Sequence, residues 1–200
     1  MDLIFVSGWA GFDKLFPNIS TRYEFIIPIY DMDEKELLNH LTSKKADILI
    51  GWSTGAHIIL KQIEILKKNY ANILLIAPFF DFMEHTDEKV IDKMISNLQK
   101  NPISVVKYFY RQCGIKRIPK IDEVDKEKLS KGLEFLKTSK VKADKLPDNI
   151  YVMHGKKDKI VPCCKDRTFK NLTILNDSGH YIDEGLIRKK VYEITNSAIF

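Results

Sequence analysis

Short apolar runs that alternate with helical patterns constrain the fold of this chain more than any other feature of its sequence. Each run is four or five residues long and rich in isoleucine, leucine and valine, and the runs cover residues 3–6, 25–29, 47–50, 73–77, 150–153 and 172–175. Near-continuous apolar runs are typical of strands buried on both faces, as in a parallel sheet covered by helices. Helical patterns at residues 33–42, 56–69 and 182–196 complete the prediction of a doubly wound α/β sheet.

The stretch from Asp81 to Lys145 breaks this alternation, because it contains no convincing strand. It carries three helical patterns, at residues 87–99, 104–113 and 125–138, which are separated by Pro102, Gly114 and Pro119. We therefore expect residues 81–145 to form a helical insertion between the fourth and fifth strands. A length of 200 residues suits one domain with a substantial core, so we expect residues 1–200 to form a single domain.

Composition excludes several classes of protein. The 44% hydrophobic and 30% charged content is ordinary for a soluble globular protein, and no apolar run is long enough to span a bilayer. The N-terminal residues lack the basic region of a signal peptide, so we expect a cytoplasmic protein. Three cysteines, with Cys163 and Cys164 adjacent, fit neither a disulfide framework nor a zinc site. No metal-ligand spacing and no phosphate-binding loop appears, so we expect no metal and no cofactor.

Residues 51–55 read Gly-Trp-Ser-Thr-Gly and match the G-x-S-x-G pattern of serine hydrolases. Ser53 follows the apolar run 47–50 and precedes a helical pattern, which places it in a strand-to-helix turn. Gly51 and Gly55 permit a sharp turn there, and the start of the helix brings backbone amides beside the serine. The bland alternative is a small residue in a tight turn. A catalytic serine requires a histidine and a carboxylate to orient it.

Two later segments supply such partners. "HGKKDKIVP" (residues 154–162) follows the fifth apolar run, and "NDSGH" (residues 176–180) follows the sixth. Both lie just past the carboxyl end of a predicted strand, where open α/β sheets place their sites. Asp158 and His180 are therefore the candidates.

"GWSTG", "HGKKDKIVP" and "DSGH" resemble the nucleophile, acid and histidine motifs of the α/β-hydrolase family. The resemblance implies an α/β-hydrolase fold with a minimal, mostly six-stranded parallel sheet flanked by helices and a helical lid between the fourth and fifth strands. The chain departs from most members in lacking the initial two-stranded hairpin. The resemblance makes Ser53 the nucleophile, His180 the general base and then acid, and Asp158 the orienting carboxylate. Asp81 is the competing acid, because some hydrolases carry it after the fourth strand.

The resemblance also implies an oxyanion hole made of two backbone amides, which stabilise the tetrahedral intermediate. We expect one amide from Thr54, directly after the nucleophile, and the other from Trp9 in the loop after the first strand. Asp177 and Asp183 are expected to cap a turn and the final helix. We expect His57 to pack in the core and His154 to support the acid loop.

The insertion is basic, since no acidic residue lies between Asp92 and Asp122. Its positive charge is either a solvated surface or a docking surface for an acidic partner. The candidate docking residues are Lys107, Arg111, Lys116 and Arg117.

"SGWAG", "GWSTG" and "FYRQCG" are similar to segments of esterases that cleave the methyl ester of pimeloyl-acyl-carrier-protein in biotin synthesis. That resemblance implies a serine carboxyl-ester hydrolase whose acyl-ester substrate is delivered by acidic acyl carrier protein. One alternative is a general short-chain carboxylesterase or thioesterase, and another is a non-catalytic binding protein on a hydrolase scaffold. We expect neither a nucleic acid nor a membrane as partner.

Overall fold

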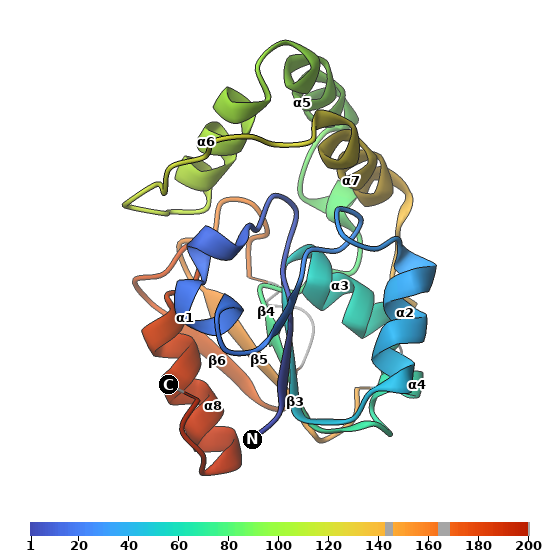
Figure 1. Cartoon of the computed structure of the whole chain (residues 1–200), viewed down its shortest axis with the longest axis vertical. Helices are drawn as coiled ribbons and strands as arrows, with labels where there is room; N and C mark the ends of the chain where they lie inside the picture. Colours follow the sequence, from blue (N-terminus) through green and yellow to red (C-terminus); the bar gives the residue numbers. More distant parts are fainter. Residues whose placement is uncertain (143–145, 164–168, 200) are drawn as a thin grey trace.

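The computed structural model of the chain describes residues 1–142, 146–163 and 169–199 (Figure 1). Six strands form one sheet in the order β2-β1-β3-β4-β5-β6, and every pair is parallel. The prediction of a six-stranded parallel sheet is confirmed. The strands are β1 (Leu3–Val6), β2 (Glu24–Ile26), β3 (Ala46–Trp52), β4 (Tyr70–Ile76), β5 (Ile150–Gly155) and β6 (Leu172–Leu175). Cys164 and the last residues of the expected insertion, 143–145, lie outside the described residues.

Helices cover both faces of the sheet. On one face lie α2 (Glu34–Ser43), α3 (Thr54–Lys61) and α4 (Ile63–Leu66), and on the other lie α1 (Pro17–Ser20) and α8 (Glu184–Thr195) (Figure 1). Side chains alternate along each strand, so Leu3 and Phe5 join the apolar cluster on the α8 side while Ile4 and Val6 join the cluster beneath α2 and α3. This double burial explains why the strands read as continuous apolar runs.

One predicted helix is two helices in the structure. The apolar pattern at residues 56–69 predicts a single helix, but α3 ends and α4 begins at Gln62, whose φ of −110° and ψ of 17° are not helical. The Gln62 amide still donates to the carbonyls of Ile58 and Ile59, so the break is one residue long. The apolar faces of both helices continue across it, and the periodicity therefore hides the break.

The predicted insertion forms α5 (Glu88–Lys100), α6 (Pro102–Gln112) and α7 (Lys126–Thr138), which lie beyond the carboxyl ends of the strands (Figure 1). The side chains of Asp87, Asn101 and Asp125 accept hydrogen bonds from first-turn amides and cap the three helices. Pro102 is the first residue of α6, where a proline costs no hydrogen bond. The apolar faces of these helices join the same core as the α8 side of the sheet.

Two short 3-10 helices, Asp13–Leu15 and Phe82–Glu84, and the four-residue α1 were not predicted. Each is too short to show an apolar period. None of the described helices is both long and apolar enough to cross a lipid bilayer.

The backbone is strained where four strands end. Among the described residues, the non-glycine positions with positive φ are Ala10 (52°), Ile29 (65°), Ser53 (55°), Ala77 (49°) and Asn196 (54°). The first four follow β1, β2, β3 and β4 within four residues. Such conformations cost roughly 1–3 kcal/mol each and persist only where the surrounding structure imposes them. The strain marks the carboxyl edge of the sheet as a candidate site.

Candidate active site

Ser53 occupies the sharp turn between β3 and α3. It precedes the first helical residue with φ 55° and ψ −115°, and its amide donates to the carbonyl of Ile76 at 2.8 Å. Neither of the flanking glycine positions has room for a side chain. A Cβ at Gly55 would lie 2.2 Å from the Val6 carbonyl oxygen, and one at Gly51 would lie 2.8 Å from the Ala56 amide nitrogen. The motif glycines therefore allow α3 to approach β1 closely enough to place Ser53 above the sheet.

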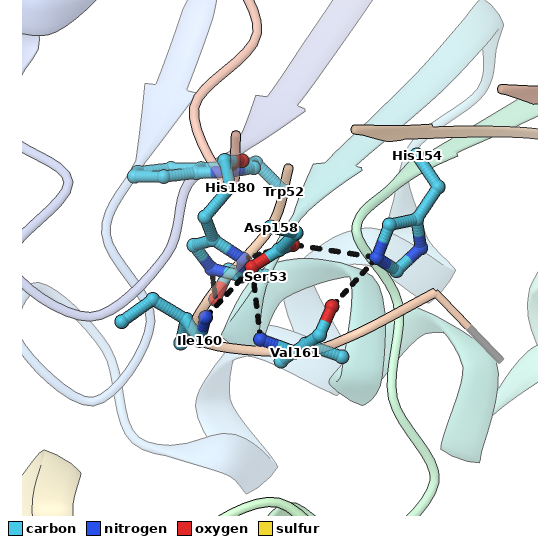
Figure 2. Close-up of polar contacts among 7 residues, drawn as sticks. All are labelled: Trp52, Ser53, His154, Asp158, Ile160, Val161 and His180. Atoms are coloured by element: carbon cyan, nitrogen blue, oxygen red, sulfur yellow. Dashed lines mark hydrogen bonds and ion pairs between the residues drawn. The ribbon is translucent and has the colours of Figure 1, made fainter. Parts of the chain in front are cut away.

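Ser53, His180 and Asp158 form one continuous chain of hydrogen bonds (Figure 2). His180 Nε2 lies 2.8 Å from Ser53 Oγ, and His180 Nδ1 lies 2.8 Å from Asp158 Oδ2. All three side chains are buried. The three residues come from the ends of β3, β5 and β6, which meet at the same edge of the sheet because the strands are parallel.

Asp158 is held as an ionised acceptor. Burial alone would raise its pKa. The positive charge that His180 carries when it is protonated, hydrogen bonds from His154 and His180, and the Val161 amide together lower the pKa well below the ordinary value. Its Oδ1 accepts from the amides of Ile160 at 2.8 Å and Val161 at 2.9 Å. An ionised carboxylate only accepts hydrogen bonds, so His180 Nδ1 carries the proton and Nε2 presents its lone pair to the Ser53 hydroxyl. This tautomer can accept the serine proton.

His154 supports this carboxylate from the other side, as Figure 2 shows. Its Nε2 lies 2.7 Å from the Val161 carbonyl oxygen and 3.3 Å from Asp158 Oδ2. Because a carbonyl oxygen only accepts, Nε2 is the protonated nitrogen. His154 therefore fixes the loop that carries Asp158.

Asp81, the competing acid, forms neither a hydrogen bond nor an ion pair with His180 in the part of the chain that the structure describes. Its carboxylate lies 2.6 Å from Lys140 Nζ and accepts from the Met83 amide at 2.9 Å. It caps a short 3-10 helix at the base of the insertion. Two further aspartates were expected to act as caps. Asp177 pairs with Lys157 at 2.8 Å, and Asp183 caps α8.

The two expected oxyanion donors lie beside each other and line the same cavity as Ser53. Thr54 is the first residue of α3, so its amide has no acceptor within the helix. The Trp9 amide donates to Thr54 Oγ1 over a long 3.3 Å. Both residues are buried, Trp9 in the loop after β1 and Thr54 at the start of α3.

Two indole N–H groups tie the site together, and neither contact was predicted. Trp52 Nε1 donates to the His180 carbonyl at 2.9 Å, which anchors the histidine loop to β3. Trp9 Nε1 donates to the Leu129 carbonyl at 2.8 Å, which anchors the loop after β1 to α7. The Trp9 ring also lies against Gly132, where a Cβ would come within 2.7 Å of it.

The cavity over Ser53 has a volume of about 190 Å³ and is lined mainly by apolar side chains of the insertion. Phe82, Ile91, Phe109 and Leu133 contribute to this wall. His85 also lines it. The Nε2 atom of His85 is buried without a hydrogen-bond partner in the described structure, and burial lowers the pKa of this histidine. The cavity therefore suits a small, mostly apolar group.

The four predicted docking residues lie outside this cavity. Lys107 and Arg111 are one helical turn apart on α6, and neither lines the cavity. Lys116 and Arg117 line a separate hollow of about 660 Å³, whose wall also contains Asp177, Asp183 and Glu184. The cluster of basic residues in the sequence is thus divided between two places in the structure.

His57 is a core residue, although it lies one turn from Ser53. Its Nδ1 lies 3.0 Å from the Phe79 carbonyl and its Nε2 lies 2.9 Å from Ser139 Oγ. The carbonyl only accepts, so Nδ1 carries the proton and Nε2 accepts from the serine hydroxyl. Burial lowers the pKa of His57 to about 4. The described residues contain no group of three His, Cys, Asp or Glu side chains arranged to hold a metal ion.

Comparison with known proteins places this arrangement among solved folds. No protein-family model matches the sequence, and no curated protein matches it significantly. An esterase from Thermogutta terrifontis superposes with a TM-score of 0.64 at 14% identity, covering 98% of this chain and 91% of the other. An epoxide hydrolase from Bacillus megaterium gives 0.68 at 10% identity, covering 98% and 93%. The α/β hydrolase MGS-M2 from a Medee basin deep-sea metagenome library gives 0.63 at 12% identity, covering 98% and 90%. With its six parallel strands and helices on both faces, the chain has the α/β-hydrolase fold.

Proposed function

We propose that the protein is a serine carboxyl-ester hydrolase that acts through Ser53, His180 and Asp158. The observation that carries this proposal is the unbroken chain of two 2.8 Å contacts from Ser53 Oγ through His180 to an ionised Asp158. The strained turn at Ser53 and the largely apolar cavity above it support the same assignment.

In the proposed reaction, His180 Nε2 takes the Ser53 proton as Oγ attacks the ester carbonyl carbon. The oxyanion accepts from the amides of Thr54 and Trp9, and it replaces the long bond from Trp9 to the Thr54 hydroxyl. The alcohol leaves with the proton from His180, and an acyl-enzyme remains. Water then loses a proton to His180 and attacks the acyl-enzyme, which releases the acid and restores Ser53.

Replacing Ser53 with alanine tests the assignment. We expect kcat/KM for short-chain p-nitrophenyl esters to fall by about 10⁴-fold or more, because the nucleophile is lost. A fluorophosphonate probe should label the native protein and the Ser130→Ala variant, which lacks a different buried serine, but not Ser53→Ala. Full activity in a folded Ser53→Ala protein would refute the assignment. A folded native protein that resists labelling would favour a binding protein on a hydrolase scaffold.

Within this class we propose the methyl ester of pimeloyl-acyl-carrier-protein as the substrate. The motifs "SGWAG" and "GWSTG" support this choice, as does the exposure of Arg111, Lys116 and Arg117. Reversing the charges of Lys107, Arg111, Lys116 and Arg117 should slow demethylation of the carrier-bound ester and spare a free small ester. Equal loss on both substrates would mean that these residues are not a docking surface.

The small cavity favours a second candidate of the same reaction type. A volume of about 190 Å³ suits a short acyl group, so a general short-chain carboxylesterase or thioesterase is the alternative. Rapid hydrolysis of short free esters, with no demethylation of the carrier-bound ester, would select this candidate.

A further inference from the structure

A second and larger hollow lies between α5 and α6, next to the catalytic cavity. This α5–α6 groove has a volume of about 740 Å³. Val90, Met94 and Tyr108 line both the groove and the cavity that contains Ser53. The two spaces are therefore neighbours that share an apolar wall.

The groove follows one face of α5 away from the cavity. Its α5 lining recurs every three or four residues, at Val90, Lys93, Asn97 and Lys100, which is the spacing of one helix face. At a rise of 1.5 Å per residue, Lys100 lies about 15 Å along the helix from Val90. The end that carries Val90 borders the catalytic cavity, and the end that carries Lys100 lies near the turn into α6.

The cavity end of the groove exposes apolar surface. Val90 is 49% exposed and Tyr108 is 57% exposed, although large apolar side chains normally lie inside a protein. Val105, which is largely buried, lines the groove further along α6. An extended hydrocarbon chain would cover this surface and remove it from water.

The rim of the groove carries a net positive charge, because its lining contains three lysines and one aspartate. The lysines of the lining are Lys89, Lys93 and Lys100. None of them forms an ion pair with an acidic side chain of residues 1–142, 146–163 or 169–199. The acidic residue of the lining, Asp87, caps α5 by accepting from the Lys89 amide. An apolar floor with a lysine rim is complementary to a chain that ends in an anion.

We propose that the α5–α6 groove binds the distal part of the ester substrate, an extended apolar chain that ends in an anionic group held by Lys93 and Lys100. The inference rests on the proposed ester hydrolysis at Ser53 and specifies its substrate class. Neither Lys107 nor Arg111, Lys116 or Arg117 lines this groove, so it is distinct from the docking residues considered above.

Matched pairs of p-nitrophenyl esters test the proposal. One member of each pair ends in a carboxylate, as in the monoesters of suberic, sebacic and dodecanedioic acids, and the other is the alkanoate of the same carbon number. A second series that ends in a phosphonate distinguishes the kind of anion. We expect kcat/KM for one anionic length to exceed that of its neutral partner by about fivefold, a ratio that declines as salt is added.

The Lys93→Ala/Lys100→Ala variant should bring this ratio close to one, mainly through a loss of kcat/KM on the anionic ester. The matched control is Lys126→Ala/Lys131→Ala, which removes two exposed lysines of α7 that lie outside the groove and should keep the native ratio. A native ratio of one or less at every length would overturn the inference, as would a ratio that survives in the Lys93/Lys100 variant. In both cases hydrolysis of the neutral esters would leave the proposed function standing. A native protein inactive on every ester would instead refute the proposed function and this inference with it.

Discussion

Asp158 and Asp81 are the two candidates for the carboxylate that orients His180, and their contacts differ. Each follows a strand of the same sheet, yet Asp158 contacts His180 and Asp81 contacts Lys140. Replacing Asp158 with asparagine should lower kcat by about 10³- to 10⁴-fold, because an amide no longer holds His180 in the tautomer that accepts the serine proton.

The matched change at Asp81 serves as the control. Asp81→Asn removes an ion pair at the base of the insertion and should change kcat for short p-nitrophenyl esters by less than about twofold. The two rates, measured on folded proteins, decide between the acids. A larger loss in Asp81→Asn than in Asp158→Asn would reverse the assignment.

At this scale the sequence predicts the proposed reactive groups better than the groups that hold them in place. Ser53, Asp158 and His180 are singled out because each follows an apolar run, and the structure brings them into contact. Trp52 is conspicuous in the motif, but its partner is the carbonyl of His180, 128 positions away. Every residue carries a carbonyl, so no sequence signal distinguishes the one that an indole will reach.

At the scale of elements, the contact between Trp9 and α7 joins the loop after β1 to the insertion. Replacing Gly132 with alanine should lower kcat/KM for short esters about tenfold, because the new Cβ displaces the Trp9 ring and with it the proposed oxyanion donor. The clash with the buried Trp9 ring costs about 1–3 kcal/mol, and the helix propensity of alanine offsets about 1 kcal/mol of that cost. The melting temperature should therefore fall by only about a few degrees while the activity falls about tenfold.

Measuring activity and thermal unfolding on the same preparation separates these effects. Lys131→Ala changes the neighbouring exposed position of α7 and should leave kcat/KM unchanged. Native activity in Gly132→Ala would show that the position of Trp9 does not matter for the reaction.

The same scale shows why some elements are predicted and others are not. The strands and long helices bury a whole face, so their apolar periods reveal them. The elements between β1 and β2 are three and four residues long and carry no period. The end of α3 at Gln62 is likewise a local backbone change that leaves the apolar pattern intact.

At the scale of the whole molecule, the buried His57 makes stability depend on pH. The pKa of His57 is about 4 in the folded protein and 6.5 for a histidine without these surroundings, as in the unfolded chain. Between these two pH values the unfolded chain therefore binds more protons than the folded protein. Stability therefore falls as the pH drops from 6.5 toward 4. The contribution of His57 to the free energy of unfolding should be about 2 kcal/mol smaller at pH 5 than at pH 7.

Urea denaturation at the two pH values measures this difference. In the His57→Gln variant the side chain does not titrate, so its free energy of unfolding should change less between pH 7 and pH 5. Ser130→Ala is the control, since it changes a buried side chain that does not titrate and should keep the native pH dependence. The same pH dependence in native protein and His57→Gln would contradict the prediction.

Surface charge at this scale is predicted less well than the core. The insertion is basic as expected, but its three-dimensional arrangement places Lys93 and Lys100 in one groove and Lys116 and Arg117 in another hollow. Which charges share a groove depends on how the helices are rotated and packed. A single sequence shows which face of a helix is apolar. It does not show which polar residues of different helices will line the same groove.

The positive φ angles at Ala10, Ile29, Ser53 and Ala77 have a consequence for heat resistance. These residues concentrate unfavourable backbone conformations at the edge that holds the candidate active site, while none of the described strand residues has a positive φ. On heating, that edge should therefore unfold locally before the core of the sheet does. Thermal inactivation would then precede the loss of helical structure, and the first damage on warming would be to the arrangement of the catalytic loops.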